Sequence, residues 1–328
     1  MAFLGKAAIA IAVATGAALS ATSALVSTAR AQEAVFEGRD KWLFPGWEKI
    51  DVVDKAKVDN VIDLIDFTNK ELAKRNIGLV VVVVPAKALI HQDKLPEGKT
   101  LSSDVLGLYA NILRDLATKG IATVDLMPVL KALPQDQDAF FRTDYHWTAW
   151  ASEAAAKATA DLINSKWKLS GQAGDGAKLA EWTKERRFGD LAANFMTPEQ
   201  RAAIGREVFT VRKQGGAEGE GLLDEAKAPV HVVGNSFTAP YLGFSQALSH
   251  DLDRAVTLTW NPGDVGPWAT MIQYLESDSF RQNPPQVIVW QFNEGQMQQS
   301  PSAEGLWAQS SIMPDAEWKK KVEASLAQ

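Results

Sequence analysis

The spacing of apolar and polar residues changes repeatedly along the chain between a helical and a strand pattern. Between residues 55 and 75, apolar residues recur every three or four positions, which predicts an amphipathic helix. Residues 79–84 then form an uninterrupted apolar run that ends at Pro85. Because a strand without polar alternation is buried on both faces, this run is typical of a parallel sheet.

The same succession of helix and strand continues to residue 290. Helical spacing predicts further helices at residues 103–119, 148–166, 239–251 and 268–277, and short apolar runs predict strands at residues 121–126, 230–233, 255–260 and 287–290. Strands that alternate with helices indicate a doubly wound α/β fold, in which a mainly parallel sheet carries helices on both faces.

Residues 170–228 interrupt this succession. Gly-rich segments flank the interruption at residues 170–176 and 215–221. It is expected to be an insertion, and two interpretations stay open, a lid over the site or a variable surface excursion. With it, residues 32–328 are expected to form a single domain.

The first 31 residues have the pattern of a secretory signal. Lys6 precedes an Ala-rich apolar run, and Ala29-Arg30-Ala31 offers small residues for cleavage after Ala31. An uncleaved N-terminal anchor is the alternative, and either way the folded part is expected in the periplasm. The chain has no Cys, so disulfides are excluded and stability depends on a hydrophobic core. No later segment approaches the roughly 20 apolar residues of a membrane span.

The charge of the chain argues against one class of partner. With 34 basic and 40 acidic residues, the formal net charge is -6. Nucleic-acid binding depends on clustered positive charge, so no nucleic-acid partner is expected.

Polar side chains follow the predicted strands, where ligands of an open α/β sheet bind. Lys87 and His91 follow the first strand, and the segments 234–238, 261–266 and 291–294 follow three later strands. Residues 142–147, which begin with Arg142, lead directly into the helix at 148–166. The chemistry of the protein is therefore expected at this edge of the sheet, with Lys87, His91 and Arg142 as candidate oxyanion or substrate-binding residues.

Ser236 is the candidate nucleophile. Gly234-Asn235-Ser236 forms a turn between strand and helix, where backbone N–H groups at a helix N-terminus can stabilise an oxyanion. Thr238 stands where the Gly-x-Ser-x-Gly elbow of α/β-hydrolases has its second glycine. The alternative is a serine that only caps the helix.

Asp144 and His146 are two positions apart, so in an extended segment their side chains point the same way. The carboxylate could then hold the imidazole in the tautomer that accepts a proton from Ser236. A metal-ligand pair, or an Asp144 that caps the next helix, are the alternatives. The chain has four His and no Cys, without a spaced cluster, so no metal is expected. His231 is interpreted as a core residue, and His250 as the end of a helix.

Two further features belong to the predicted site. The turn Asn261-Pro262-Gly263 could supply an additional oxyanion donor, or be an ordinary turn. The chain has 11 Trp residues, and several flank the candidate loops, where aromatic faces suit sugar rings. Most of them, including Trp150, are nonetheless expected in the core.

Several of these segments together resemble the alginate O-acetyltransferases of the AlgJ and AlgX type. The resemblance covers residues 38–297, and it rests on the segments 84–87, 95–96, 143–148, 234–238 and 289–294. Its specific part is Asp-x-His ahead of Gly-x-Ser, the reverse of the order in ordinary SGNH esterases. Too little chain follows Met297 for the C-terminal carbohydrate-binding module of the AlgX type, so the single-domain AlgJ form fits better.

The resemblance implies an SGNH hydrolase-like fold and a periplasmic enzyme without cofactor. It implies that Ser236 accepts the acetyl group, that His146 is the general base and acid, and that Asp144 orients it. Asn261 or Gly263 would complete the oxyanion site. The substrate would be a polysaccharide, and the acetyl donor would be a membrane-bound acyltransferase. A polyuronate substrate is negatively charged, as this chain is, and a local basic patch could bind it. The patch would consist of Lys87, Lys94, Arg142, Arg186 and Arg187.

Two other functions stay open. A polysaccharide acetyl esterase would use the same triad with water as acceptor. A non-catalytic carbohydrate-binding subunit of an acetylation complex would use none of it.

Overall fold

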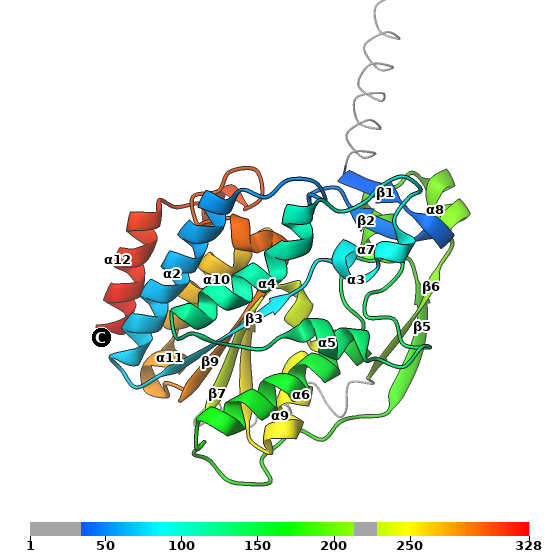
Figure 1. The fold of residues 1–328 in the computed structure, drawn as a ribbon. Helices are drawn as coiled ribbons and strands as arrows, with labels where there is room; N and C mark the ends of the chain where they lie inside the picture. The colour runs from blue at the N-terminus through cyan, green and yellow to red at the C-terminus, as the bar shows by residue number, and fades with distance from the viewer. Residues whose placement is uncertain (1–33, 213–227, 328) are drawn as a thin grey trace, which may run out of the picture.

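A five-stranded parallel sheet forms the centre of the fold (Figure 1). The computed structural model describes residues 34–212 and 228–327, so the predicted signal and the Gly-rich segment 215–221 lie outside the described residues. The strand order is β4-β3-β9-β7-β8, and each neighbouring pair is parallel. The strands are β3 (Gly78–Val84), β4 (Ala122–Thr123), β7 (Val230–Gly234), β8 (Val256–Trp260) and β9 (Val287–Asn293).

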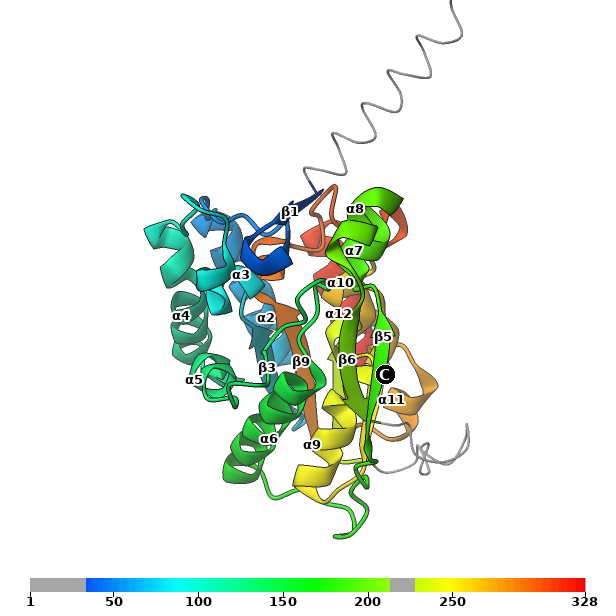
Figure 2. The same cartoon turned by 90° about the vertical axis from the view of Figure 1, so that its right-hand side faces the viewer.

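Helices cover both faces of this sheet, so the predicted doubly wound α/β fold is confirmed. One layer contains α2 (Lys55–Ala73), α4 (Ser103–Thr118), α10 (Gly266–Leu275) and α12 (Asp315–Leu326). The other contains α6 (Ala149–Lys166) and α9 (Phe244–Leu252), which pack side by side. Figure 2 shows α6 and α9 in front of the strands and α12 behind them.

Helix starts follow from side-chain caps that the sequence supplies. Asp54, Ser102 and Thr148 each accept a hydrogen bond from a backbone N–H in the first turn of α2, α4 and α6. The cap at Thr148 also determines where the preceding loop, which carries Asp144 and His146, enters the helix.

Three predicted elements differ from the structure. The strand expected at 121–126 ends at Thr123, because Asp125 caps the short helix α5 (Leu126–Lys131). The helix expected at 239–251 begins only at Phe244, after a 3-10 turn at Pro240–Leu242 and a left-handed Gly243 with φ of 84°. Strand β9 extends to Asn293 because its polar end is buried with the rest of the strand.

The predicted insertion contributes a small two-stranded sheet and two helices. Its described part contains two antiparallel strands, β5 (Trp182–Arg187) and β6 (Glu207–Arg212), and between them α7 (Asp190–Phe195) and α8 (Pro198–Ile204). Figure 1 shows α7 and α8 beside the N-terminal hairpin of β1 (Val35–Glu37) and β2 (Leu43–Pro45). The shared core consists of Val35, Leu43, Leu191, Ala192 and Ile204. Phe209 and Val211 of β6 belong to the main core, so the insertion is attached to the domain through both cores.

The remaining packing predictions have mixed outcomes. His231 is buried and hydrogen-bonds Thr257 and Thr259 through its two ring nitrogens, which confirms a satisfied core histidine. Trp150, expected in the core, is only half-buried and lies 6.2 Å from the ring of Trp182. Within residues 34–212 and 228–327, no helix has the length and apolar character to cross a bilayer.

Candidate active site

Ser236 lies where β7 ends, as the first residue of a 3-10 turn, Ser236–Thr238. The side chain of Asn235 accepts the N–H of Phe237, and the hydroxyl of Thr238 donates to the carbonyl of Asn235. A side chain at position 234 would overlap Thr238, so this turn requires Gly234. The backbone N–H of Ser236 has no partner among the described residues, which leaves it free to bind a ligand oxygen.

The Asp144 and His146 side chains reach Ser236 from the loop before α6. His146 Nε2 lies 2.8 Å from Ser236 Oγ, and His146 Nδ1 lies 2.7 Å from Asp144 Oδ1. The backbone N–H of His146 donates to the same carboxylate oxygen at 2.9 Å. Asp144 is 3% exposed and His146 7%. Three polar side chains thus form one hydrogen-bonded row in a largely dry environment.

The electrostatics of this row favour a charged imidazole. Burial works to lower the pKa of His146, but the hydrogen bond and charge of Asp144, together with the charge of Asp190, outweigh it and raise that pKa. Burial works to raise the pKa of Asp144, but the hydrogen bonds and charge of His146, together with Asp190, outweigh it, so that pKa lies below its usual range. A carboxylate that stabilises imidazolium is what a general base needs when it accepts a proton.

Lys87 is buried against the loop that carries Asp144 and His146, and its side chain does not reach the surface. Its side chain is fully buried, and Nζ donates to the carbonyls of Leu43, Arg142 and Asp144 at 2.6, 3.1 and 2.8 Å. Burial lowers the pKa of Lys87 to about 8, against the raising effect of nearby carboxylates. The prediction of Lys87 as a substrate-binding cation is therefore corrected to a structural role beneath Asp144.

His91 is likewise buried, whereas Arg142 is half-buried. His91 is 9% exposed, packs against Trp42 with the ring centres 4.2 Å apart, and has its pKa lowered to about 3, mainly by burial. Arg142 donates from Nη1 to the carbonyl of Lys41. The structure thus gives His91 packing contacts in place of the predicted role in substrate binding, and that role stays a prediction for Arg142.

The predicted basic patch is not assembled. Lys94 pairs with Asp40 at 2.7 Å, and the guanidinium of Arg187 lies 4.0 Å from the centre of the Phe209 ring. Arg186, by contrast, is exposed on β5. Since Lys87 is fully buried, the five cations do not form one surface.

The turn Asn261-Pro262-Gly263 does not offer its amide to Ser236. Asn261 Nδ2 donates to Thr270 Oγ1 and Gln273 Oε1, at 3.2 and 2.8 Å. Both side-chain protons of Asn261 are used in this way, because the turn after the edge strand β8 folds back onto α10. Gly263 has open space around it. Asn261 thus secures the turn, and the structure provides no contact that supports it or Gly263 as an oxyanion donor.

The insertion holds the loop that carries Asp144 and His146, which the sequence pattern did not indicate. The Glu207 carboxylate accepts the backbone N–H of Arg142, and the N–H and hydroxyl of Thr143, at 2.6, 2.8 and 2.7 Å. The N–H of Gly189 donates to the Thr143 hydroxyl at 3.2 Å. A lid that only covered the site would not need these bonds. The insertion therefore helps to hold the loop of Asp144 and His146 in place.

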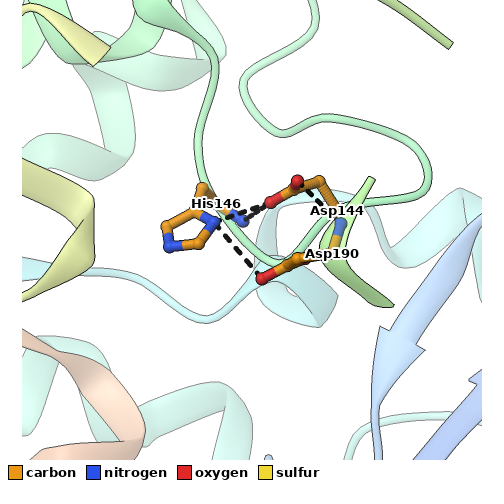
Figure 3. Close-up of side chains that lie close together, drawn as sticks. All are labelled: Asp144, His146 and Asp190. Carbon is orange, nitrogen blue, oxygen red and sulfur yellow. Dashed lines mark hydrogen bonds and ion pairs between the residues drawn. The ribbon is translucent and has the colours of Figure 1, made fainter. Parts of the chain in front are cut away.

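Asp190, the first residue of α7, lies beside the same imidazole (Figure 3). Its Oδ2 is 3.5 Å from His146 Nδ1, and its backbone N–H donates to Asp144 Oδ2 at 2.9 Å. Among the residues that the structure describes, Asp144, His146 and Asp190 form the one group whose ligand atoms are close enough to hold a metal, all within 4.8 Å. Because 2.7 Å between Nδ1 and Oδ1 is a hydrogen-bond distance, we interpret the group as a proton-sharing pair with a second carboxylate beside it.

A buried amide network joins the end of β9 to the serine turn. Asn235 Nδ2 donates to Gln296 Oε1 at 2.9 Å, and the Asn235 N–H donates to Gln291 Oε1 at 3.2 Å. Asn293 Oδ1 accepts from Gln291, and Asn293 Nδ2 donates to the hydroxyl of Tyr145. The polar residues after Trp290 signalled this site, but their partners depend on the fold.

One aromatic side chain next to this site is partly open to solvent. Trp47 is 37% exposed, and its ring lies 5.4 Å from the rings of Tyr145 and Phe195. Tyr145 precedes His146, and Phe195 belongs to the insertion. An indole in this position can present its face to a substrate at the edge of the site.

The chain matches a described family over most of its length. Residues 35–294 match the family model of the SGNH hydrolase-like domain of the acetyltransferase AlgX. Over 78% of its length the chain is 32% identical to the probable alginate O-acetylase AlgJ of Pseudomonas fluorescens, covering 66% of that protein. Over 67% of its length it is 31% identical to the alginate biosynthesis protein AlgX of Pseudomonas putida, covering 48% of that protein. The chain thus spans less than two thirds of the AlgJ relative and about half of the AlgX relative.

Solved structures agree with this match. The O-acetyltransferase domain of Pseudomonas putida AlgJ has a TM-score of 0.72 at 27% identity, with 89% of this chain and 99% of that chain covered. Pseudomonas aeruginosa AlgX shares the fold, with a TM-score of 0.62 at 20% identity over 88% of this chain and 67% of that chain. The resemblance inferred from a few short segments thus extends through the whole sheet and its helices, and the chain belongs to the SGNH hydrolase-like acetyltransferases of the AlgX type.

Proposed function

We propose that this protein is a periplasmic O-acetyltransferase that esterifies hydroxyl groups of alginate or a similar exopolysaccharide through an acetyl-enzyme on Ser236. The observation that carries the proposal is the hydrogen-bonded row from Ser236 through His146 to Asp144, with separations of 2.8 and 2.7 Å. The relatives named alginate O-acetylases support the substrate class. The periplasmic location follows from the signal expected at residues 1–31.

In the first step Ser236 takes the acetyl group from the donor. Its Oγ attacks the acetyl carbonyl carbon while its proton moves to His146 Nε2, and Asp144 stabilises the imidazolium that forms. The backbone N–H of Ser236, which has no partner within residues 34–212 and 228–327, donates to the oxyanion of the tetrahedral intermediate. The intermediate then collapses, the bond to the leaving group breaks, and the leaving group takes the proton from His146.

In the second step a sugar hydroxyl reverses this sequence. The hydroxyl gives its proton to His146 and attacks the acetyl-serine carbonyl, and collapse of the intermediate releases the acetylated sugar. The proton returns from His146 to Ser236 Oγ, so the enzyme is regenerated without a cofactor. A membrane-bound acyltransferase is the proposed donor, and Trp47 is the proposed surface for the acceptor ring.

The test uses the purified protein with an activated acetyl ester and an alginate oligosaccharide. We expect mass spectrometry to detect acetylated oligosaccharide, and a transient gain of one acetyl group on the peptide that contains Ser236. Free acetate with unmodified sugar would instead identify an esterase, in which water replaces the sugar as acceptor.

Ser236→Ala separates the catalytic proposal from a scaffold. The variant retains the capping contacts of Asn235 and Thr238, which use no atom of the serine side chain. We expect it to fold as the parent does and to lose acetyl transfer. Undiminished acetylation by the variant would mean that the protein only binds the polysaccharide.

A further inference from the structure

Asp190 is an acidic side chain at the site to which the proposed steps assign no task. Its carboxylate approaches His146 Nδ1, the nitrogen that already bonds Asp144. Figure 3 shows the two carboxylates on the same side of the imidazole, opposite the nitrogen that faces Ser236. A second carboxylate here is not needed to fix the tautomer, because the 2.7 Å bond to Asp144 already does so.

The backbone holds Asp190 in this position from two sides. The Tyr145 N–H donates to Asp190 Oδ1 at 2.6 Å, and the Asp190 N–H donates to Asp144 Oδ2 at 2.9 Å. Gly189 lies so close to the loop that a Cβ there would overlap the carbonyl group of Thr143. The approach of Asp190 to the imidazole is therefore built into the contact between insertion and loop.

The charges around the imidazole show what a second carboxylate changes. Asp144 and Asp190 both favour the protonated form of His146, whereas Arg187, on β5, disfavours it. The charge of Asp190 also acts on Lys87 and on the hydroxyl of Tyr241, and raises the pKa of both. Enclosure by the protein, and then the charge of Asp144, raise the pKa of Asp190. Removing Asp190 would take away one of the two negative charges that favour protonated His146, while the opposing charge of Arg187 would remain.

We infer that Asp190 is a positioning residue of the acetyltransferase site, a second carboxylate that the insertion adds to the Nδ1 side of His146 to orient the imidazole and stabilise its charged form. The inference rests on the proposed role of His146 as the base. It makes the insertion a contributor to acid–base chemistry, and Asp190 acts through His146 without touching the substrate.

The direct test is the protonation equilibrium of His146 in Asp190→Asn. Asparagine retains an oxygen for the Tyr145 N–H and removes the charge. The chain has only four His, so the imidazole of His146 can be followed by NMR after labelling histidine and assigned with His146→Gln. We expect the pKa of His146 to fall by about one unit. An unchanged pKa in a folded variant would overturn the inference.

The kinetic readout should move in the same direction. Neutral His146 is the form that accepts the serine proton, so activity rises with pH through its pKa, and the acid limb of the kcat/KM profile should shift to lower pH in Asp190→Asn. Glu185→Gln, an exposed acid on β5, is the matched control and should leave the profile in place. A shifted acid limb in the control, or an unshifted one in Asp190→Asn, would contradict the proposal.

The two proposals fail in distinguishable ways. The NMR titration needs no turnover, so a shifted His146 pKa in a protein that transfers no acetyl group would support the Asp190 inference and reject the proposed activity. Asp190→Ser, whose hydroxyl can still accept the Tyr145 N–H, provides a second neutral variant if the asparagine variant does not fold.

Discussion

Replacing Gly189 with Ala adds one methyl group where the insertion touches the loop of Asp144 and His146. Gly189 has φ of -69°, which alanine adopts readily, so the effect is steric alone. The new Cβ would overlap the Thr143 carbonyl group and lie 2.5 Å from the Asp144 nitrogen. Ordinary contact requires about 3.5 Å, so the insertion and loop must separate by about 1 Å.

The magnitude follows from that displacement. A misplacement of about 1 Å costs on the order of 100-fold in rate, while overpacking costs about 1–3 kcal/mol in the free energy of unfolding. We therefore expect Gly189→Ala to remain folded and to lose most of its acetyl transfer. The acid limb of its pH profile should also shift to lower pH, because Asp190 moves with Gly189.

The assay measures acetyl transfer from an activated ester, with urea unfolding in parallel. Gly107→Ala is the matched control, since Gly107 lies within α4 and its added Cβ would meet only Asn111 Nδ2, at 3.5 Å. That variant should transfer acetyl groups at the parental rate and gain about 0.5–1 kcal/mol in stability. A Gly189→Ala variant within about twofold of the parental rate would refute the view that the insertion positions the loop.

Three further predictions follow from buried or partly exposed groups. Lys87→Met should lower the free energy of unfolding by about 3 kcal/mol in urea titrations, because three buried carbonyls lose a charged donor. Burial raises the pKa of Glu294 from 4.5 to about 8, so the unfolded chain loses this proton at lower pH than the folded chain does, and the free energy of unfolding falls as pH rises between these values. Glu294→Gln should make that fall shallower when unfolding is measured from pH 5 to 8. Trp47→Ala should raise the KM for oligosaccharide severalfold, consistent with about 1 kcal/mol for an aromatic contact, and leave hydrolysis of a small acetyl ester unchanged.

The alternation of helices and strands and the position of the serine turn could be predicted because both depend on local patterns. The apolar run of β3 and the Gly-x-Ser at the end of β7 are contiguous in the sequence. The spacing of Asp144 and His146 also placed two side chains in one loop. These features need no knowledge of which distant segments meet.

The other parts of the site depend on contacts between distant segments. Asp190 and Glu207 are ordinary acidic residues in sequence, and only the docking of the insertion brings them to the loop. Lys87 was expected at the surface because a fully buried lysine is rare. Its burial depends on three carbonyls from two other segments, and no local pattern encodes such a set.

The hydrogen bonds that build the site have a consequence for how the protein folds. Two of them, between Asp190 and Asp144 and between His146 and Ser236, join residues 46 and 90 positions apart. The entropy of closing such loops changes little with length, so these contacts are expected to form together and after the helices. During refolding, helical content would therefore return before turnover. The specific activity of a preparation therefore reports the fraction of completely folded molecules. Its circular dichroism spectrum also includes molecules that have formed helices but not the site.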